Sequence, residues 1–240
     1  MKTIAVLIVA TTTAVWGSGW QLYRSDPSPA PNARSVCFNA PYTVSVLCDG
    51  TPPRIYNEIN AAQHIDLQVP PGVWGFATEG SYYVISNRSN SYIYSVTTTG
   101  SVLSSFRCPR DGPADLSQWG SGYVWVAIPG ENRCYELTYS GSIITSYTPP
   151  GYQVTALETL YYFPDGIYGD PATHRVYVMG YGSFYLENPL GLTSDMTTGT
   201  PPWDGIVVVN GADNRIYQYV FVGPLGVAPA SWGRIKALLR

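Results

Sequence analysis

The chain has 240 residues, of which 45% are hydrophobic and only 12% are charged. This composition suits one large all-β domain or two small ones with a sizeable core, and it excludes the highly charged profile of a disordered chain. The net charge is −3 and no cluster of Lys or Arg is present, so we expect no nucleic-acid partner. Twenty Tyr, seven Trp, 24 Gly and 20 Pro favour strands joined by tight turns.

Residues 1–17 have the features of a secretory signal peptide. Lys2 supplies a positive charge, residues 3–16 form an apolar run, and Val15 and Gly17 are small enough for a cleavage site. At about 1.5 Å per residue the run spans about 21 Å, which is short of the roughly 30 Å of a bilayer core. We therefore expect a secreted or surface-attached mature chain without a transmembrane segment. The alternatives are a buried first strand and an uncleaved anchor.

Residues 18–34 are expected to form a Pro-rich spacer. The stretch RSDPSPAPNARS, residues 24–35, has a proline every few residues and no apolar periodicity. Residues 35–240 are then expected to form a single domain with an irregular C-terminal tail.

A strand–turn–strand unit of about 40 residues recurs along this domain. In each unit a β-rich stretch and a polar turn precede a strand that begins with a short motif such as RIY or RVY. Pro/Gly breaks separate the units. In the second and third units a glycine turn and a further strand follow the strand that carries the motif. The tyrosines that mark the five units are Tyr56, Tyr94, Tyr135, Tyr177 and Tyr217.

A four-stranded sheet of this size cannot bury both faces alone, but radially stacked sheets cover one another. The sequence therefore predicts an all-β fold, a β-propeller of five blades with four antiparallel strands each. It resembles propellers of the YVTN, NHL and WD-repeat kind, and GDPATHRVYVMG (Gly169–Gly180) is similar to the YVTN-type phrase DPAT-x-x-VYV. The resemblance implies architecture and no particular activity, because propellers host many functions. We expect the recurring tyrosines to lie between adjacent blades.

The unit boundaries leave the closure of the ring open. The fourth unit carries an extra loop, PLGLTSDMTTGT, and the fifth lacks a clean fourth strand. Either the C-terminal tail or a strand from the N-terminal segment completes the last blade. The expected blades span residues 35–69, 73–106, 114–147, 152–188 and 204–240.

Four cysteines in a secreted chain are expected to be oxidised. With Cys37 and Cys48 placed at the same end of neighbouring strands, and Cys108 and Cys134 likewise, we predict the disulfides Cys37–Cys48 and Cys108–Cys134. The alternative is four reduced, buried thiols.

No motif of a metal or cofactor site is present. The chain has no C-x₂-C pair, no D-x-D-x-D run, no H-E-x-x-H, no G-x-S-x-G and no P-loop, and its two histidines fall in unrelated units. We expect neither a metal nor a cofactor.

The turns between the second and third strands are predicted to share one face of the propeller with the breaks between blades. Polar side chains beside aromatic rings on this face suit a sugar or a peptide. The alternative is that Asn and Asp only satisfy tight turns. The expected ligand-binding residues are Trp74, Asn90, Arg110, Asp111, Asn132, Trp203 and Asp213.

The leading hypothesis is a binding or scaffolding module for a protein or a carbohydrate, rather than an enzyme. The first alternative is a glycan-cleaving hydrolase, because five-bladed glycosidases place two carboxyl groups around the channel, about 5–9.5 Å apart. The candidates are Asp115, Glu158 and Asp204, which do not recur in register. The second alternative is a subunit of an extracellular self-assembly, in which the unfinished last blade associates with another copy.

Overall fold

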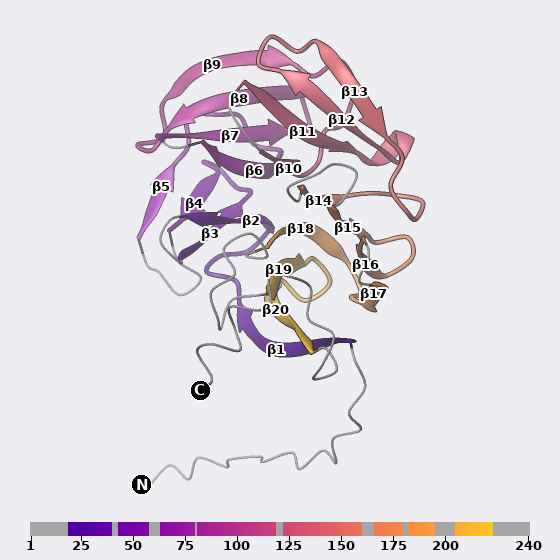
Figure 1. Cartoon of the computed structure of the whole chain (residues 1–240). Coiled ribbons are helices and arrows are strands. Elements are labelled where there is room, and N and C mark those ends of the chain that lie inside the picture. Colours follow the sequence, from indigo (N-terminus) through magenta and orange to yellow (C-terminus); the bar gives the residue numbers. More distant parts are fainter. Residues whose placement is uncertain are drawn as a thin grey trace, which may run out of the picture.

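The protein is a five-bladed β-propeller. The computed structural model describes residues 19–39, 43–57, 63–79, 81–118, 122–159, 166–179, 182–194 and 205–222. Within them the strands form five antiparallel sheets of four strands each, arranged in a ring around a common axis (Figure 1). No helix in this described part is long and apolar enough to cross a bilayer.

Each sheet forms one blade, and the strands of each blade are given below in order from the axis outward. Blade 1 contains β2 (Ala33–Asn39), β3 (Thr43–Cys48), β4 (Arg54–Tyr56) and β5 (His64–Asp66). Blade 2 contains β6 (Val73–Glu79), β7 (Tyr82–Asn87), β8 (Tyr92–Thr97) and β9 (Val102–Arg107). Blade 3 contains β10 (Leu116–Ser117), β11 (Tyr123–Ile128), β12 (Arg133–Thr138) and β13 (Ile143–Tyr147), with a 3₁₀ turn at Pro129–Glu131.

The remaining two blades follow the same order. Blade 4 contains β14 (Ala156–Thr159), β15 (Gly166–Asp170), β16 (Arg175–Val178) and β17 (Gly182–Tyr185). Blade 5 contains β18 (Pro189–Ser194), β19 (Gly205–Asn210), β20 (Arg215–Val222) and β1 (Gly19–Pro27).

The N-terminal strand closes the ring. β1 pairs antiparallel with β20, with Ser25 opposite Tyr217 and Pro27 opposite Arg215. The described part of residues 18–34, expected to be a spacer, therefore contains a strand and the start of another. Proline does not prevent this, because an edge strand tolerates a missing N–H. Blade 5 is complete within one chain, which removes the unfinished blade as a reason for self-association.

The expected extra loop of the fourth unit is in part the innermost strand of blade 5. The letters PLGLTS belong to β18, in which Leu190 and Leu192 are buried. Our assignment of this stretch to a loop was wrong. Proline and glycine suggested a turn, whereas Gly191 is required because a Cβ there would lie 2.5 Å from the carbonyl oxygen of Arg34 in blade 1.

Each blade buries both faces, as the repeat predicted. In β11, Val124, Val126 and Ile128 pack against blade 2, while Trp125 and Ala127 pack against blade 4. The alternation follows from the opposite orientation of successive side chains in a strand. Sheets of this kind are stable only within the ring, because each needs two neighbours.

The recurring tyrosines lie between adjacent blades, which confirms their expected packing role. Tyr56 and Tyr135 are buried members of two inter-blade clusters, and Tyr94, Tyr177 and Tyr217 pack against three others. One tyrosine thus serves each of the five interfaces.

The predicted disulfides are wrong, since all four cysteines are free. Within each predicted pair the two side chains lie in different inter-blade clusters. Cys48 lies between blades 5 and 1 and Cys37 between blades 1 and 2, while Cys108 lies between blades 2 and 3 and Cys134 between blades 3 and 4. In addition, β3 places Cys48 opposite Ala33, four residues before Cys37 on β2. At about 3.3 Å per residue this separation is about 13 Å, and a disulfide tolerates at most about 7 Å between Cα atoms.

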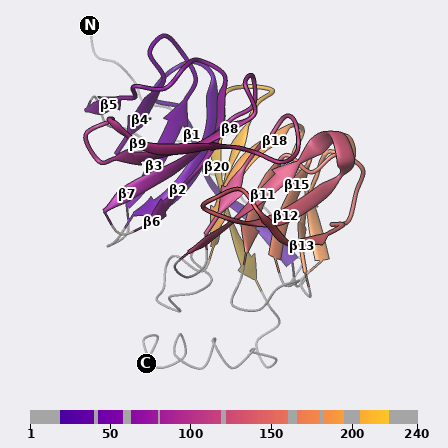
Figure 2. The ribbon, with the colours of Figure 1, turned by 90° about the horizontal axis from the view of Figure 1, so that it is seen from above.

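The innermost strands define two ends of the axis. Contacts between these strands align them side by side: Gly191 lies against Arg34 and Ser35 near their starts, and Cys37 lies beside Thr78 and Ser117 beside Thr159 near their finishes. We call the end at which the strands start the entry end and the other the exit end; Figure 2 shows the ring turned by 90° from Figure 1. Trp74 and Leu190 lie near the starts of their strands, whereas Thr78 and Thr193 lie near the finishes. The two ends carry different side chains, and both are described below.

Candidate functional site

A buried carboxyl group occupies the middle of the axis. Asp115, directly before β10, is fully buried, and its Oδ1 accepts a hydrogen bond from Ser35 Oγ (2.7 Å). Its Oδ2 accepts hydrogen bonds from the backbone N–H groups of Leu157 and Leu192, both at 3.0 Å. These partners belong to β2, β14 and β18, so one side chain of blade 3 connects blades 1, 4 and 5. Burial raises the pKa of Asp115 to about 7, although its hydrogen bonds favour ionisation.

Toward the exit end the axis opens into a cavity of about 160 Å³. Every blade contributes to its wall. Phenylalanine rings, hydroxyl groups, an amide, a thiol and one carboxyl group are present. The lining residues are Val36, Cys37, Phe38, Phe76, Ala77, Thr78, Leu116, Ser117, Gln118, Glu158 and Thr193.

Glu158, in β14, supplies the carboxyl group of the cavity wall. Ser117 Oγ donates a hydrogen bond to its Oε1 (3.1 Å), and the Thr193 hydroxyl is a further hydrogen-bond partner. Burial raises the pKa of Glu158 to about 8, and the nearby Asp115 raises it as well. The side chain is therefore mostly protonated at neutral pH, and it presents a hydrogen-bond donor in addition to an acceptor.

The thiol in the cavity wall is held neutral. Cys37 Sγ lies 3.6 Å from Thr78 Oγ1 and 3.6 Å from the carbonyl oxygen of Phe38. Burial raises the pKa of Cys37 to about 12. A cysteine acts as a nucleophile when its pKa is lowered, so Cys37 contributes a polarisable surface to the cavity wall and does not serve as a nucleophile.

At the entry end the axis is closed by an indole ring. Trp74 of blade 2 donates from Nε1 to the carbonyl oxygen of Leu190 in blade 5 (3.3 Å), which is not a neighbouring blade. Its ring also packs against the blade 1–blade 5 and the blade 3–blade 4 clusters. The guanidinium groups of Arg34 and Arg88 lie against the same ring. Of the expected ligand-binding residues that the structure describes, Trp74 is the one that lies on the axis.

Two of the expected ligand-binding residues bond the recurring tyrosines. Asn90 donates to the Tyr94 hydroxyl (2.8 Å), and the Tyr217 hydroxyl donates to Asp213 (2.6 Å). The same four-residue spacing joins Tyr135 to Glu131 and Tyr177 to Thr173. This repeated contact is a structural brace between the third strand and its preceding turn.

Asn132 joins two blades. Its amide nitrogen donates to the carbonyl oxygen of Gly151 (3.0 Å), and its Oδ1 accepts from the backbone N–H of Val154 (3.0 Å). Its φ of 48° places it in the left-handed region, which asparagine tolerates better than most residues. Both ends of the amide are therefore occupied by the break between blades 3 and 4.

Arg110 and Asp111 line an open depression of about 600 Å³ beside the break between blades 2 and 3. Arg110 pairs with Glu131 (3.6 Å), and Asp111 pairs with Arg107 (3.4 Å). These charges neutralise one another. The remaining expected ligand-binding residue, Trp203, and the candidate catalytic residue Asp204 lie outside the described residues.

Of the three carboxyl groups named for hydrolysis, the two that the structure describes, Asp115 and Glu158, do not share one wall. Glu158 lines the axial cavity, but Asp115 is not among its lining residues and is occupied by three donors. A pair of carboxyl groups facing one cleft, which glycoside hydrolysis requires, is thus not formed by Asp115 and Glu158.

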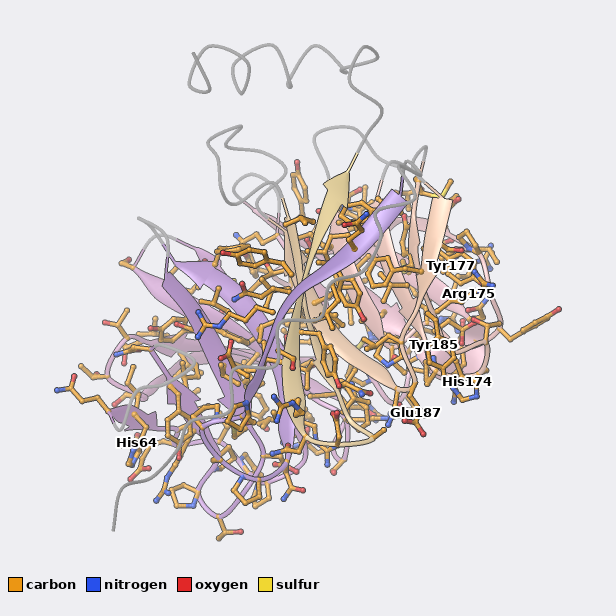
Figure 3. All side chains as sticks on the ribbon, turned by 90° about the horizontal axis from the view of Figure 1, so that it is seen from below. His64, His174, Arg175, Tyr177, Tyr185 and Glu187 are labelled. Carbon is orange, nitrogen blue, oxygen red and sulfur yellow. The ribbon has the colours of Figure 1, made fainter. Side chains whose placement is uncertain are left out.

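No group of three or more His, Cys, Asp or Glu side chains within the described ranges is arranged to hold a metal ion. His64 lies in blade 1 and His174 in the turn before β16 of blade 4, far apart in Figure 3. The His174 ring instead contacts the carbonyl oxygen of Glu187 and the ring of Tyr185, which Figure 3 shows beside it.

Sequence reasoning identified Glu158 and Trp74 but missed the other residues at the two ends of the axis. Arg34 lies in the stretch that was expected to be a spacer, and Arg88 lies in a turn. Cys37, Thr78 and Ser117 recur about 40 residues apart near the finish of successive innermost strands. Aligning those strands, instead of the third strands with their tyrosines, would have shown the cavity wall.

The comparisons with known proteins agree on the fold. No family model and no curated protein match the chain. Among solved structures, glutaminyl cyclase of Myxococcus xanthus superposes with a TM-score of 0.64 at 12% identity, covering 85% of this chain and 97% of that one. Virginiamycin B lyase of Staphylococcus aureus gives 0.48 at 11% identity, with 84% and 99% covered. A BBS1N–ARL6DN complex gives 0.46 at 12% identity, with 87% and 63% covered. The chain is a β-propeller repeat protein, and identities this low extend the likeness no further than the fold.

Proposed function

We propose that this chain is a secreted or surface-attached binding protein that takes an uncharged polar group of a protein or carbohydrate ligand into the axial cavity. The observation that carries the proposal is the buried carboxyl group of Glu158 in a wall to which all five blades contribute, where burial raises its pKa and favours the protonated form. Concave sites with a few convergent polar groups on an apolar lining are the usual form of ligand pockets.

The size and lining of the cavity select the ligand group. At about 160 Å³ the cavity has room for several waters, and therefore for a small polar group such as a primary amide or a hydroxymethyl group. Glu158 supplies a donor, Ser117 and Thr193 supply hydroxyls, and Phe38 and Phe76 cover the apolar part. A carboxylate ligand is disfavoured, because the described lining residues include a carboxyl group and no cation.

A glycan and peptide array, followed by titration of the best ligand, tests this proposal. We expect wild-type affinity to fall as pH rises through about 8, because ionisation removes the donor of Glu158. Glu158→Gln keeps an N–H donor and should bind without this pH dependence, whereas Glu158→Leu should lose binding by at least about tenfold. Glu136→Gln, outside the cavity, is the control. Ligands that bind Glu158→Leu as tightly as wild type would refute the proposed site.

Export is part of the same proposal and rests on residues 1–17. A secretion-competent host should release a chain whose first residue, read by N-terminal sequencing, is residue 18 or one close to it. A version lacking residues 2–17 should stay inside the cell. Retention of both versions would contradict secretion without affecting the binding proposal.

A second candidate function is acid–base catalysis by the same carboxyl group. A general acid or base works best when its pKa lies near the working pH, and the Glu158 pKa of about 8 is close to neutral pH. The reaction to test is cyclisation of an N-terminal glutaminyl residue, the activity named for the Myxococcus propeller. In it the α-amine forms a bond to the side-chain amide carbon, the bond to the amide nitrogen breaks, and ammonia leaves. Glu158 would take the proton of the amine and give one to the departing nitrogen.

Mass spectrometry of a glutaminyl peptide incubated with the chain distinguishes the two candidates. Loss of ammonia that Glu158→Gln abolishes would support catalysis, since glutamine cannot move the proton. An unchanged peptide that nevertheless binds would support the binding module.

A further inference from the structure

Two arginines at the entry end lie against one ring, and no carboxylate of the described residues pairs with either. Arg34 Cζ is 4.7 Å from the centroid of the Trp74 ring, and Arg88 Cζ is 4.3 Å from it. Because both distances refer to one centroid, the two guanidinium carbons are no more than about 9 Å apart. Arg34 comes from β2 of blade 1, and Arg88 from the turn after β7 of blade 2, so the ring assembles the pair from separate blades.

The ion pairs of the described residues all lie elsewhere. They join Arg24, Arg54, Arg107, Arg110 and His64 to carboxylates, and neither Arg34 nor Arg88 takes part in one. Arg34 Nε is buried and has no hydrogen-bond partner. A buried guanidinium donor without an acceptor is costly, because it loses its water without replacement.

The two cations also act on each other. Burial lowers the pKa of Arg88, and the charge of Arg34 lowers it further. Cation–π contact with an indole ring offsets part of this cost, but it satisfies no N–H donor. An acceptor with negative charge would satisfy the buried Arg34 Nε donor and relieve the repulsion between the two guanidinium groups.

We propose that the entry end of the axis binds an oxyanion, with Arg34 and Arg88 donating to its oxygens and Trp74 covering the adjacent part of the ligand. The group is a carboxylate, sulfate or phosphate carried by a small ligand. This site is separate from the Glu158 cavity, since it lies at the opposite end of the axis and carries two positive charges, whereas the Glu158 carboxyl group is held mostly neutral. It therefore stands whether or not the proposed function holds.

Titration of the purified chain with sodium glucuronate, sulfate and phosphate tests the site, with chloride keeping the ionic strength constant. The readout is the arginine Nε–H region of ¹⁵N NMR spectra, supported by thermal unfolding. We expect one of the three anions to shift the Arg34 and Arg88 signals saturably and to raise the unfolding temperature, because it binds only the folded chain. The anion that binds most tightly identifies the chemistry of the ligand.

Substitutions distinguish a specific anion-binding site from general screening of the protein's charges by salt. Arg34→Gln and Arg88→Gln should each weaken binding by about tenfold or more, which is the loss of one charge-assisted hydrogen bond. Arg133→Gln removes the same charge from an exposed side chain of blade 3 and should leave binding unchanged. If one variant fails to fold, the other still gives the comparison. Equal weakening in all three variants, or no saturable shift with any anion, would overturn the proposal.

Discussion

The two ends of the propeller axis are built from the same five strands but have opposite characters. At the entry end Trp74 fills the axis and two unpaired arginines surround its ring. At the exit end short side chains such as Thr78 and Ser117 leave a cavity. Among the described residues that line this cavity, Glu158 supplies the carboxyl group. The ring geometry thus provides two separate positions for ligands, and the length and charge of a few side chains decide what each position accepts.

Asp115 separates the two ends, and its removal should have the largest effect. Asp115→Ala leaves the Ser35 hydroxyl and the N–H groups of Leu157 and Leu192 buried without their acceptor. We expect a loss of about 3–5 kcal/mol in the free energy of unfolding, measured with denaturant. Asp213→Ala, an exposed control, should cost under about 1 kcal/mol. Similar costs for both would show that the axis does not depend on Asp115.

Gly75 tests how tightly the axis is packed between Trp74 and Asp115. A Cβ at this position would lie 2.4 Å from Asp115 Cα, and the backbone cannot move aside without displacing blade 3. Gly75→Ala should therefore cost about 1–3 kcal/mol, as overpacked cores do. Gly130→Ala, where a Cβ meets nothing within 4 Å, is the matched control. If both substitutions have the same small effect in denaturant unfolding, this part of the axis has room that the structure does not show.

The pH dependence of stability should be set largely at the exit end. Glu158 has a pKa of about 8 when folded and an ordinary value of 4.5, so the folded chain holds a proton that the unfolded chain loses. Its stabilising contribution is full below pH 4.5 and declines as pH rises to about 8, by about 1.4 kcal/mol per pH unit.

Glu158→Gln should remove this decline, while Glu136→Gln should keep it. The measurement is urea unfolding of both variants and wild type at several values between pH 5 and 9. Asp115, whose pKa is raised to about 7, contributes a similar decline in all three chains, so the difference between curves isolates Glu158. Parallel curves would mean that the Glu158 carboxyl is ionised in the folded chain.

The smallest effect is expected from reducing agent. All four thiols are free, so dithiothreitol should change the free energy of unfolding by less than about 0.5 kcal/mol. A native disulfide would instead contribute about 2–4 kcal/mol, and its reduction would be plain in the unfolding midpoint. Such a drop would also mean that Cys37 does not line the exit cavity as a thiol.

The fold was largely predictable because the recurring strand–turn–strand unit indicates a ring of similar blades. A tyrosine at each inter-blade interface and a polar turn four residues before it give the period, and burial of both faces follows from the alternation in strands such as β11. The errors concern contacts between distant units. PLGLTS was assigned to a loop because its proline and glycine are typical of turns, and the need for Gly191 arises only against blade 1.

The candidate site was less predictable than the fold. The polar turn residues stood out in the sequence, but Asn90, Asn132 and Asp213 are occupied by structural hydrogen bonds. Arg34 belongs to a stretch without apolar periodicity, and its role depends on Trp74, which lies forty residues further along the chain. The same limit explains the cysteines, since the face of a blade to which each thiol points depends on the register of its strand.

The amino-acid sequence alone determined the all-β class, the five units and the tyrosines between them, because these follow from local periodicity repeated along the chain. Only the tertiary structure decided that β1 closes the ring, that Glu158 stands in a cavity and that Arg34 meets Arg88 at one ring. Closing a ring brings together residues from strands that are far apart in the sequence. The charge, burial and partners of those residues exist only once all five blades are in place.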